Sequence, residues 1–462
     1  MNDYQLLIIG AGPGGYEAAI RAAELGMKTA VIEKAEIGGT CLNRGCVPTK
    51  TLLHTAELLQ SARYASRYGI RIQESEPDMR AVFSRKDEVG KSLRDGLESL
   101  LESKGIVIIE GTGTICAEHS VSVTTGEGES IVTGDAVLIA SGSVPARPPI
   151  PGLDLDGVMT SDDILKGTGE LYESLVIMGG GVIGVELATF YSRLGTKVTI
   201  LEGMGRLLPN MDKELGQNLS AILKKQGVDV LTQSMVTRIT KERGLMSVEY
   251  DRSGGTSVVQ GERVLCAIGR IPNLEGVLGK GIELDMERRR IKVDSRFETS
   301  MPGVYAIGDV SSRIQLAHVA SAQGRACVEM MAGLVPSTDL KTVPGCVYCQ
   351  PEIASAGLTE EEAKARGIWA VSGKYVMFSN SRTVIREAPR SFMKIVADRE
   401  NHRILGAHLM CEHATDMISE LTSAIANGMT AEALLTVMRP HPTFEEGVTD
   451  ALRALCKKLQ SS

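Results

Sequence analysis

An internal repeat constrains the fold of this chain more than any other feature of its sequence. A shift of 169 positions superposes residues 6–33 on residues 175–202 without gaps, with 11 identities in 28 positions. The chain of 462 residues is also longer than one hydrophobic core usually supports, so two to four domains are expected. The repeat therefore predicts two domains built on one common folding unit.

The first copy of the repeat has the pattern of a dinucleotide-binding unit. An apolar run at 4–9 is followed by the turn Gly-Ala-Gly-Pro-Gly-Gly at 10–15, a helical stretch at 16–26, and a strand at 28–32 that leads into Glu33. Glycines there allow a tight turn, close approach of a pyrophosphate and close helix packing, and an acid about 20 residues further on accepts hydrogen bonds from ribose hydroxyls. The order of these elements predicts a dinucleotide site.

The second copy predicts a second dinucleotide site and its preference for NAD. Its glycines stand at 179, 181 and 184, and Glu202 takes the place of Glu33. A carboxylate at this position accepts bonds from a 2′-hydroxyl and repels a 2′-phosphate. Only Arg206 is nearby, whereas a site for NADP is expected to carry arginine just past the strand. NAD is therefore favoured over NADP.

Two cysteines lie in a turn-rich stretch directly after the first repeat copy. Cys41 and Cys46 are five positions apart, with Gly45 between them and Pro48 after them. A regular helix separates such Cα atoms by about 8.7 Å, while a disulfide needs about 4.4–6.8 Å, so the pair bridges only across an irregular turn. Gly45 permits such a turn, and Pro48 suits the first turn of a helix, whose N-terminus favours thiolate. From the residues alone, the pair is either a reactive dithiol or two small apolar residues beside a phosphate-binding turn.

Residues 12–26 and 38–50 together resemble the flavoprotein disulfide reductases, and most closely the dihydrolipoamide dehydrogenases of that family. The likeness runs nearly from end to end of the chain. It implies an α/β fold with two Rossmann-like dinucleotide-binding domains and a C-terminal α+β dimerisation domain. It also implies FAD at the first glycine turn, a redox disulfide between Cys41 and Cys46, and oxidation of protein-bound dihydrolipoamide with reduction of NAD.

The resemblance divides the chain into four segments. Residues 1–145 are expected to form the first segment of an FAD-binding domain and 146–272 an NAD-binding domain. Residues 273–343 then return to the FAD-binding domain as its second, central segment, and 344–462 form the interface domain that joins two subunits. A proline-rich connector near the first boundary fits this division.

The implied base of the reaction is a histidine near the end of the chain. The block at 441–446, His-Pro-Thr-Phe-Glu-Glu, resembles the block that supplies the catalytic pair of the family, with phenylalanine at 444 in place of the commoner leucine. His441 is expected to deprotonate the dithiol and Glu446 to orient His441. In relatives this histidine comes from the partner subunit, which implies a homodimer with shared active sites.

The other implied catalytic groups surround the flavin. By resemblance, Cys41 exchanges with the dithiol substrate, and Cys46 lies nearer the flavin and becomes the thiolate that passes electrons on. Lys50 and Glu186 resemble the ion pair on the nicotinamide side of the flavin. The alternative for this pair is that each residue merely caps its own helix.

The remaining implied residues bind the two cofactors, and Asp309 is expected to hold the ribitol chain of FAD. Ser141 stands where threonine is more usual in the family, and Gln315 replaces a common methionine. The residues implied for FAD are Gly10, Gly12, Gly14, Gly15, Glu33, Lys50, Gly113, Ser141, Gly142, Ser143, Asp309, Gln315, Leu316, Ala317 and His318. Those implied for NAD are Gly179, Gly180, Gly181, Val182, Ile183, Gly184, Glu186, Glu202, Val236 and Gly269.

Charge, hydropathy and cysteine usage narrow the setting of the protein. The net charge is −7 and no long basic run is present, which argues against nucleic acid. No apolar run reaches the roughly 18 residues of a membrane span, and no leader precedes the first strand, so a cytoplasmic protein is expected. Nine cysteines, mostly single, suit a reducing compartment. The Cys-x-x-Cys motif at 346–349 has no second pair at zinc-binding spacing, so structural thiols and no metal site are expected.

Several alternatives stay open at this point. Within the class, the chain could be another NADH-dependent disulfide reductase of the glutathione, mercuric or CoA-disulfide type. Glu202 argues against the NADPH-dependent glutathione type, and the single Cys456 near the end argues against types with a C-terminal cysteine pair. A non-catalytic subunit of a multienzyme complex is a further alternative. The expected partners are lipoyl domains or a lipoyl carrier protein of a 2-oxo acid dehydrogenase or glycine cleavage complex.

Overall fold

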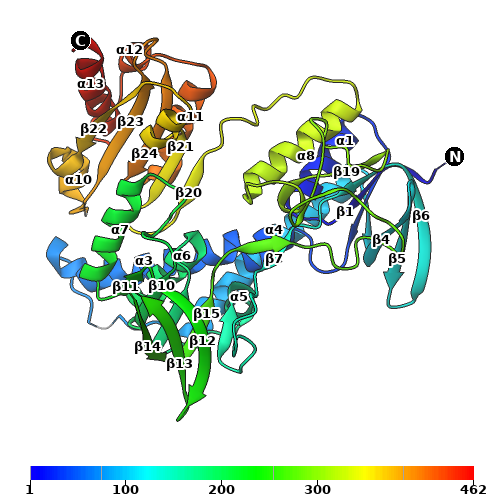
Figure 1. Cartoon of the computed structure of the whole chain (residues 1–462), viewed down its shortest axis with the longest axis horizontal. Coiled ribbons are helices and arrows are strands. Elements are labelled where there is room, and N and C mark those ends of the chain that lie inside the picture. Colours follow the sequence, from blue (N-terminus) through cyan, green and yellow to red (C-terminus); the bar gives the residue numbers. More distant parts are fainter. Residues whose placement is uncertain (1, 74, 253, 389, 462) are drawn as a thin grey trace.

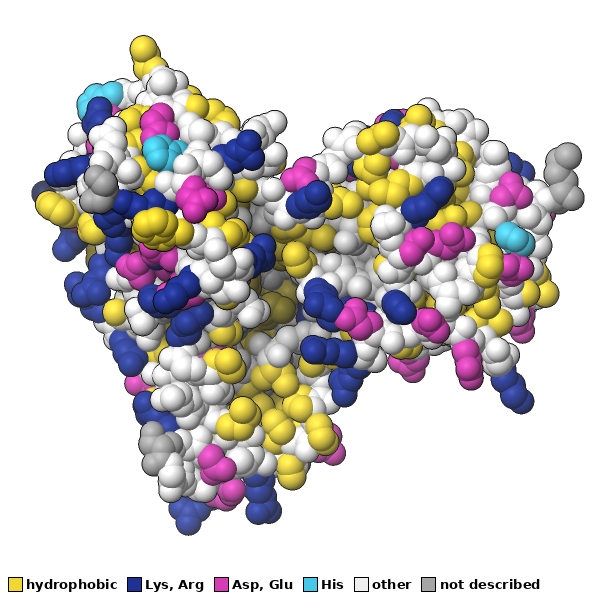
Figure 2. All heavy atoms as spheres, turned by 45° about the horizontal axis from the view of Figure 1, so that its top comes forward, with side chains coloured by type: hydrophobic (Ala, Val, Ile, Leu, Met, Phe, Trp, Pro, Cys, Tyr) yellow, Lys and Arg dark blue, Asp and Glu magenta, His cyan; other side chains and the backbone are white. Residues whose placement is uncertain are grey.

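The structure is a computed structural model that describes residues 2–461 except 74, 253 and 389. The strands among these residues form three larger sheets with helices packed against them. In Figure 1 the sheet of the first repeat copy lies at the right, that of the second copy at the lower centre, and the C-terminal sheet at the upper left. Figure 2 shows a deep hollow between these lobes.

The first sheet is built on the first repeat copy. β1 (Tyr4–Ile9) lies between β2 (Thr29–Glu33) and β6 (Gly128–Ile139) and pairs parallel with both. β3 (Val107–Glu110) continues the sheet beside β2, and β19 (Val304–Ala306) joins β6 from a distant part of the chain. Because parallel strands present their carboxyl ends at one edge, the segments that follow β1 and β19 meet there.

A helix pair covers one face of this sheet. α1 (Pro13–Glu24) packs against α8 (Ala317–Met331), so residues more than 300 positions apart lie together. Gly324 makes the close approach possible, because a Cβ there would lie 2.4 Å from the carbonyl oxygen of Gly14. The far end of β6 pairs antiparallel with a small hairpin layer, β5 (Ser120–Thr125) and β4 (Thr112–Ala117).

The cysteine segment forms two helices that meet at Gly45. α2 (Gly39–Arg44) ends before Gly45, and α3 (Cys46–Tyr64) begins directly after it. Pro48 lies in the first turn of α3, where its missing N–H has no helical acceptor to lose. The next helix, α4 (Met79–Ser103), has Asp78 as its N-cap, and the Asp78 side chain accepts hydrogen bonds from two backbone N–H groups.

The second sheet repeats the first around the second glycine turn. Its strand order is β11-β10-β9-β15-β8, all pairs being parallel. A three-stranded antiparallel sheet packs beside it, and α6 (Val182–Leu194) follows the glycine turn. The bounds are β8 (Val158–Thr160), β9 (Ser174–Met178), β10 (Lys197–Glu202), β11 (Asp229–Thr232), β12 (Met235–Glu242), β13 (Leu245–Arg252), β14 (Gly255–Gly261) and β15 (Arg263–Cys266).

A two-stranded ribbon joins the two repeat units. β7 (Ser143–Pro145) leaves the first unit and β16 (Arg270–Pro272) returns to it, and the two pair antiparallel. α5 (Ser161–Lys166) follows β8 close to this ribbon, and its N-cap Thr160 forms a capping box with Asp163. The two crossings of the chain between the units therefore lie side by side.

The third sheet lies in the C-terminal part of the chain. It has the order β20-β21-β24-β23-β22 with antiparallel pairs, and α11 (Ala414–Ala426) and α13 (Glu446–Gln460) pack against it. β22 covers 370–376 and is followed by a 3-10 turn at 377–379. The strands are β20 (Gly345–Val347), β21 (Ile353–Gly357), β22 (Ala370–Val376), β23 (Phe392–Asp398) and β24 (Ile404–Met410).

Apolar side chains fill the space between sheets and helices. Leu6, Leu7 and Ile8 of β1 are fully buried, and each such side chain contributes about 1.5–3 kcal/mol to folding. No helix of the described residues is long and apolar enough to cross a membrane. The remaining α-helices and strands are α7 (Lys213–Lys225), β17 (Met286–Glu287), β18 (Arg290–Ile291), α9 (Glu360–Ala365), α10 (Ser381–Ile385) and α12 (Ala431–Leu435).

Candidate active site

One large cavity joins both glycine turns and the two cysteines. Its volume is about 1670 Å³, and it opens between the lobes of the chain. Most of the residues predicted for the site line it, including all those predicted for FAD except Gly15 and all those predicted for NAD except Gly180 and Gly184. Gly15 and Gly184 lie behind their turns, where a Cβ would be within about 2 Å of a backbone oxygen.

The two glycine turns fit the pyrophosphates of FAD and NAD. Gly10 and Gly179 have φ near +105°, and a Cβ on either would collide with the neighbouring strand end. At Gly12 and Gly181, in contrast, a Cβ would extend into open space at the N-termini of α1 and α6. Backbone N–H groups are thus accessible at two helix N-termini, where anionic phosphates are favoured.

The two acids at the strand ends make equivalent contacts. Glu33 accepts hydrogen bonds from the backbone N–H of Ala11 at 2.7 Å and of Ala35 at 3.0 Å. Glu202 accepts them from the N–H groups two residues after it and of Gly180, both at 2.6 Å. A carboxylate has about four acceptor positions, so each acid retains capacity for ribose hydroxyls. Arg206 does not line the cavity, and it donates to the carbonyl of Pro209 at 2.9 Å.

The cysteine pair spans the irregular junction of α2 and α3, as the spacing predicted. Gly45 has φ −147° and ψ −115°, and a Cβ there would lie 2.7 Å from the carbonyl oxygen of Thr40. Cys41 and Cys46 are both free thiols. The Cys41 thiol donates a hydrogen bond to Cys46, which together with the charge of Lys50 lowers the pKa of Cys46 to about 7. The same hydrogen bond and burial raise the pKa of Cys41.

An ion pair from two different helices borders the cysteines. Lys50 of α3 lies with its Nζ 2.9 and 3.1 Å from the carboxylate oxygens of Glu186 of α6, which is almost fully buried. Burial alone would lower the pKa of Lys50, but the charge of Glu186 holds it above its usual range. Tyr348 completes the group: its N–H donates to Glu186 at 2.9 Å, and its ring centroid lies 4.6 Å from the Lys50 Nζ.

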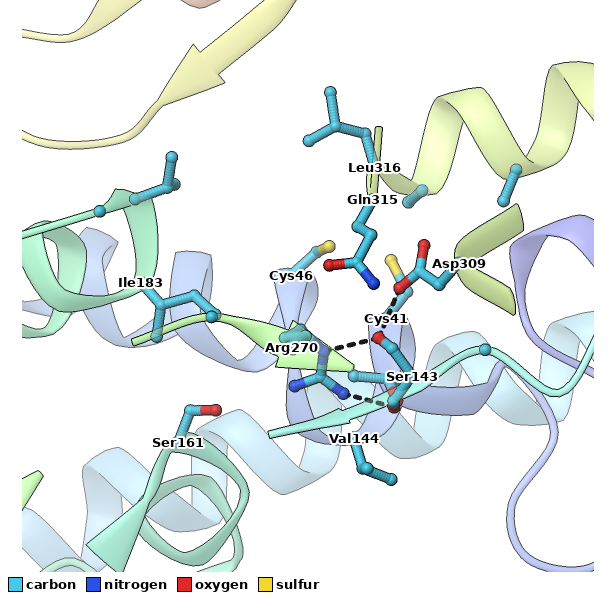
Figure 3. Close-up of a pocket in the computed structure, with 18 of the residues that line it drawn as sticks. Cys41, Cys46, Ser143, Val144, Ser161, Ile183, Arg270, Asp309, Gln315 and Leu316 are labelled. Atoms are coloured by element: carbon cyan, nitrogen blue, oxygen red, sulfur yellow. Dashed lines mark hydrogen bonds between the residues drawn. The ribbon is translucent and has the colours of Figure 1, made fainter. Parts of the chain in front are cut away.

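A series of hydrogen bonds links three residues of the cavity wall (Figure 3). The Ser143 hydroxyl donates to Asp309 at 2.5 Å, and Arg270 donates from Nε to that hydroxyl at 2.8 Å and from Nη2 to the Ser143 carbonyl at 2.7 Å. Burial raises the pKa of Asp309, while Ser143 and Arg270 oppose that rise. Asp309 is therefore presented to the cavity by Ser143. The sequence did not identify Arg270 or Tyr348 as site residues, since each acts on a group far away along the chain.

The predicted catalytic base, His441, and its partner Glu446 lie outside this cavity. His441 Nδ1 is 2.9 Å from Glu446 Oε1, and Glu446 also accepts the backbone N–H of Thr443 at 3.0 Å. These two bonds lower the pKa of Glu446 despite some desolvation. The His441 side chain is 69% exposed, and neither member of the pair is among the described residues that line the cavity. Within one chain, the two cysteines and the His441–Glu446 pair therefore lie at separate places.

The Cys-x-x-Cys motif does not act as one unit in the structure. Cys346 lines the cavity, whereas Cys349 is buried in the core beneath it, with its Sγ 3.2 Å from the carbonyl oxygen of Pro351. Burial raises the pKa of both thiols. Within the described part of the chain, no cluster of three or more histidine, cysteine or acidic side chains is placed to hold a metal ion.

Comparison with known proteins defines the class. A model of the pyridine nucleotide-disulphide oxidoreductases matches residues 4–324, and a model of the dimerisation domain of the same proteins matches residues 343–452. The chain therefore belongs to the pyridine nucleotide-disulphide oxidoreductases. This confirms the expected fold class, the cofactors FAD and NAD, and an oxidoreductase function, and the second match supports a homodimer.

The individual relatives are more specific. The chain is 39% identical to a dihydrolipoyl dehydrogenase of Bacillus subtilis over 98% of both chains. It is 36% identical to the mitochondrial dihydrolipoyl dehydrogenase of Pisum sativum, over 99% of this chain and 92% of that protein. The structure of the Cu(II) complex of the HOCl-induced flavoprotein disulfide reductase RclA from Escherichia coli has a TM-score of 0.86 and 31% identity, and covers 98% of this chain and 99% of that chain.

Proposed function

We propose that the protein oxidises dihydrolipoamide to lipoamide and reduces NAD⁺. The observation that carries this proposal is the Cys41 and Cys46 dithiol in one cavity with both dinucleotide turns. The dihydrolipoyl dehydrogenases that match the chain over nearly its whole length support the substrate. The domain bounds predicted from the sequence belong to the same proposal: 1–145 and 273–343 for FAD, 146–272 for NAD, and 344–462 for the interface.

The chemistry at the cysteines is thiol–disulfide exchange. Starting from the Cys41–Cys46 disulfide, one thiolate of the substrate attacks the Cys41 sulfur, and Cys46 leaves as a thiolate. The second substrate thiolate then attacks the substrate sulfur of this mixed disulfide, and Cys41 leaves and takes up a proton. Cys46 suits its role because a leaving thiol of low pKa departs faster, and its pKa is about 7.

Removal of a proton from the substrate dithiol requires a base. His441 has the geometry of one, since Glu446 accepts from Nδ1 and leaves Nε2 free to take a proton. His441 does not line the cavity of its own chain, so we propose that it serves the cysteines of the partner subunit. The two active sites of the homodimer would each then contain groups from both chains.

The other wall groups hold the cofactors in place. When bound, FAD supplies two-electron transfer between the reduced cysteine pair and the nicotinamide. Asp309 and the glycine turn at 10–15 would hold FAD, and Glu202 with the second glycine turn would hold NAD. Lys50 places a positive charge beside the cysteines, and Glu186 compensates that charge inside the protein.

The partners and location follow from the substrate. A lipoyl group carried by a separate lipoyl domain or lipoyl carrier protein, of a 2-oxo acid dehydrogenase or glycine cleavage complex, would reach the cavity from outside. We propose a cytoplasmic location, where a reducing environment keeps the substrate dithiol available.

Steady-state formation of NADH from dihydrolipoamide by the FAD-loaded dimer tests this function. A Cys46→Ser enzyme serves as the inactive control. The RclA structure favours a second candidate, a disulfide reductase with a different electron acceptor. NADH oxidation with oxidised glutathione, CoA disulfide, mercuric ion or Cu(II) therefore forms the rival assays, and faster turnover with any of these than with lipoamide would overturn the proposal.

A further inference from the structure

Asp162 connects two arginines that belong to different parts of the site. Its Oδ2 lies 3.6 Å from the Nε of Arg44, and its Oδ1 lies 3.4 Å from Nη1 of Arg270. The side chains of Asp162, Arg44 and Arg270 are 19%, 21% and 13% exposed, so solvent screens these contacts only partly. All three residues line the cavity.

The two arginines lead in opposite directions. Arg44 is the last residue of α2, the short helix that carries Cys41, and its Nη1 also lies 2.9 Å from Glu36. Arg270 leads through Ser143 to Asp309, as Figure 3 shows for the hydrogen-bonded part of the chain. A continuous series of polar contacts therefore extends from α2, the helix that carries Cys41, to Asp309. The carboxylate of Asp162 lies in the middle of this series.

We propose that Asp162 is a positioning residue. It holds α2, the helix that carries Cys41, in a fixed position relative to Asp309 on the cavity wall. It does so as the only carboxylate within ion-pair distance of both arginines among the described residues. Without its charge, Arg270 has no carboxylate partner of its own in the described structure and Arg44 keeps only Glu36, so two neighbouring cations repel each other. The proposal rests on the proposed function only in taking Asp309 as a contact of FAD.

Asp162 lies in the first turn of α5 but does not cap this helix. The neighbouring Asp163 performs the capping of α5, because its carboxylate accepts from the N–H of Thr160 at 2.8 Å and from the Thr160 hydroxyl at 2.7 Å. Among the described residues, the polar contacts of the Asp162 side chain are those with the two arginines and a hydrogen bond from the Ser161 hydroxyl at 3.5 Å. Asp163 therefore offers a matched control on the same short helix, with the same charge and size.

The test compares Asp162→Asn with Asp163→Asn in the FAD-loaded, reduced dimer. The first readout is the pH midpoint of Cys46 alkylation by iodoacetamide, followed by mass spectrometry. The groups that act on this thiol are Cys41, Lys50 and Glu186, and displacement of Cys41 weakens its hydrogen bond to Cys46. The second readout is the rate of FAD release. Neither readout uses lipoamide turnover, so a wrong substrate assignment does not affect the result.

Asp162→Asn is expected to raise the alkylation midpoint of Cys46 and to accelerate FAD release several-fold. Asp163→Asn is expected to lower the melting temperature without either change. If Asp162→Asn alters neither quantity or only one, or if Asp163→Asn alters both equally, then Asp162 does not link the two walls and the proposal is overturned.

Variants of Arg44, the arginine at the end of the helix that carries Cys41, provide an independent check. Arg44→Gln is expected to raise the alkylation midpoint while FAD release stays close to that of the wild type. Adding Asp162→Asn to Arg44→Gln should then accelerate FAD release but shift the midpoint little further, because both changes break the same contact. Full additivity of the two midpoint shifts would show that Asp162 acts on Cys41 by another route, and would overturn the proposal.

Discussion

Lys50 and Glu186 join the two repeat units by an ion pair whose shortest N–O distance is 2.9 Å. Lys50 is on the helix that starts at Cys46, and Glu186 is on the helix that starts after the second glycine turn. The position of the reactive thiol is thereby tied to the domain that would receive NAD. The electrostatic consequence is a lowered pKa at Cys46, to which Lys50 contributes after the hydrogen bond from Cys41.

This arrangement predicts the pH dependence of Cys46 reactivity. Only the thiolate reacts with iodoacetamide, and a pKa of about 7 means that Cys46 is protonated below that pH and ionised above it. Alkylation of reduced enzyme should therefore rise through pH 7 and level off by about pH 8. A rate that still climbs steeply between pH 8 and 9 would show an unperturbed thiol.

Removal of the Lys50 charge should move that profile upward. Lys50→Gln takes away a positive charge that favours the thiolate, so the midpoint should rise by up to about one pH unit, equivalent to about 1.4 kcal/mol. Lys34→Gln, a change of a second lysine that lines the cavity but is not among the groups acting on Cys46, provides the control. An unchanged midpoint in Lys50→Gln would contradict the electrostatic role of this lysine.

The exchange mechanism predicts the result of removing one sulfur. Cys46→Ser should reduce dihydrolipoamide oxidation by at least about a thousandfold, because no leaving thiolate remains. Cys116→Ser, at an exposed position outside the cavity, is the matched control and should keep full activity. The measurement is NADH formation at saturating substrate, and substantial turnover by Cys46→Ser would remove this cysteine from the mechanism.

The position of His441 predicts complementation between inactive subunits. Dimers of Cys46→Ser alone and of His441→Ala alone each lack one group at both sites. A random one-to-one mixture makes half of the dimers hybrid, each with one complete site, so activity should return to about one quarter of wild type. If hybrids verified by mass remain as inactive as both parents, His441 does not act across the dimer.

The contacts of Glu202 predict a change of nucleotide preference. Glu202→Ala should lower kcat/KM for NAD⁺ by about tenfold or more, since a hydrogen bond to a charged group contributes about 1.5–3 kcal/mol. The gain with NADP⁺ should remain incomplete, because Arg206, the arginine nearest to Glu202 in the sequence, donates to the carbonyl of Pro209 and does not line the cavity. A wild-type enzyme that already prefers NADP⁺ would contradict the assignment.

The sequence predicted the elements that follow local rules. The apolar run at 4–9 forms a strand with those bounds, and Pro48 lies in the first turn of a helix as predicted. The stretch before Gly45 was interpreted as a turn, but it forms the short helix α2. The first glycine turn and Glu33 followed from the dinucleotide-binding pattern, and the second turn and Glu202 followed from the repeat.

The parts of the site that the sequence missed depend on contacts between distant segments. Tyr348 supports Glu186 through its backbone N–H, a role that leaves no signal in the choice of side chain. Arg270 reaches Ser143 only because the two crossing strands of the linking ribbon pair with each other. Such contacts arise from the tertiary fold, and spacing along one sequence does not reveal them.

Glu33 and Glu202 also bear on how such a protein can change over evolutionary time. Each acid closes its own glycine turn through a backbone hydrogen bond, at 2.7 Å in the first unit and 2.6 Å in the second. A lineage that exchanged Glu202 for another residue to adopt a different nucleotide would loosen the loop that has to receive it. Glu202 therefore serves both the nucleotide preference and the stability of the glycine turn. A change of nucleotide preference at this position requires compensating substitutions elsewhere in the turn.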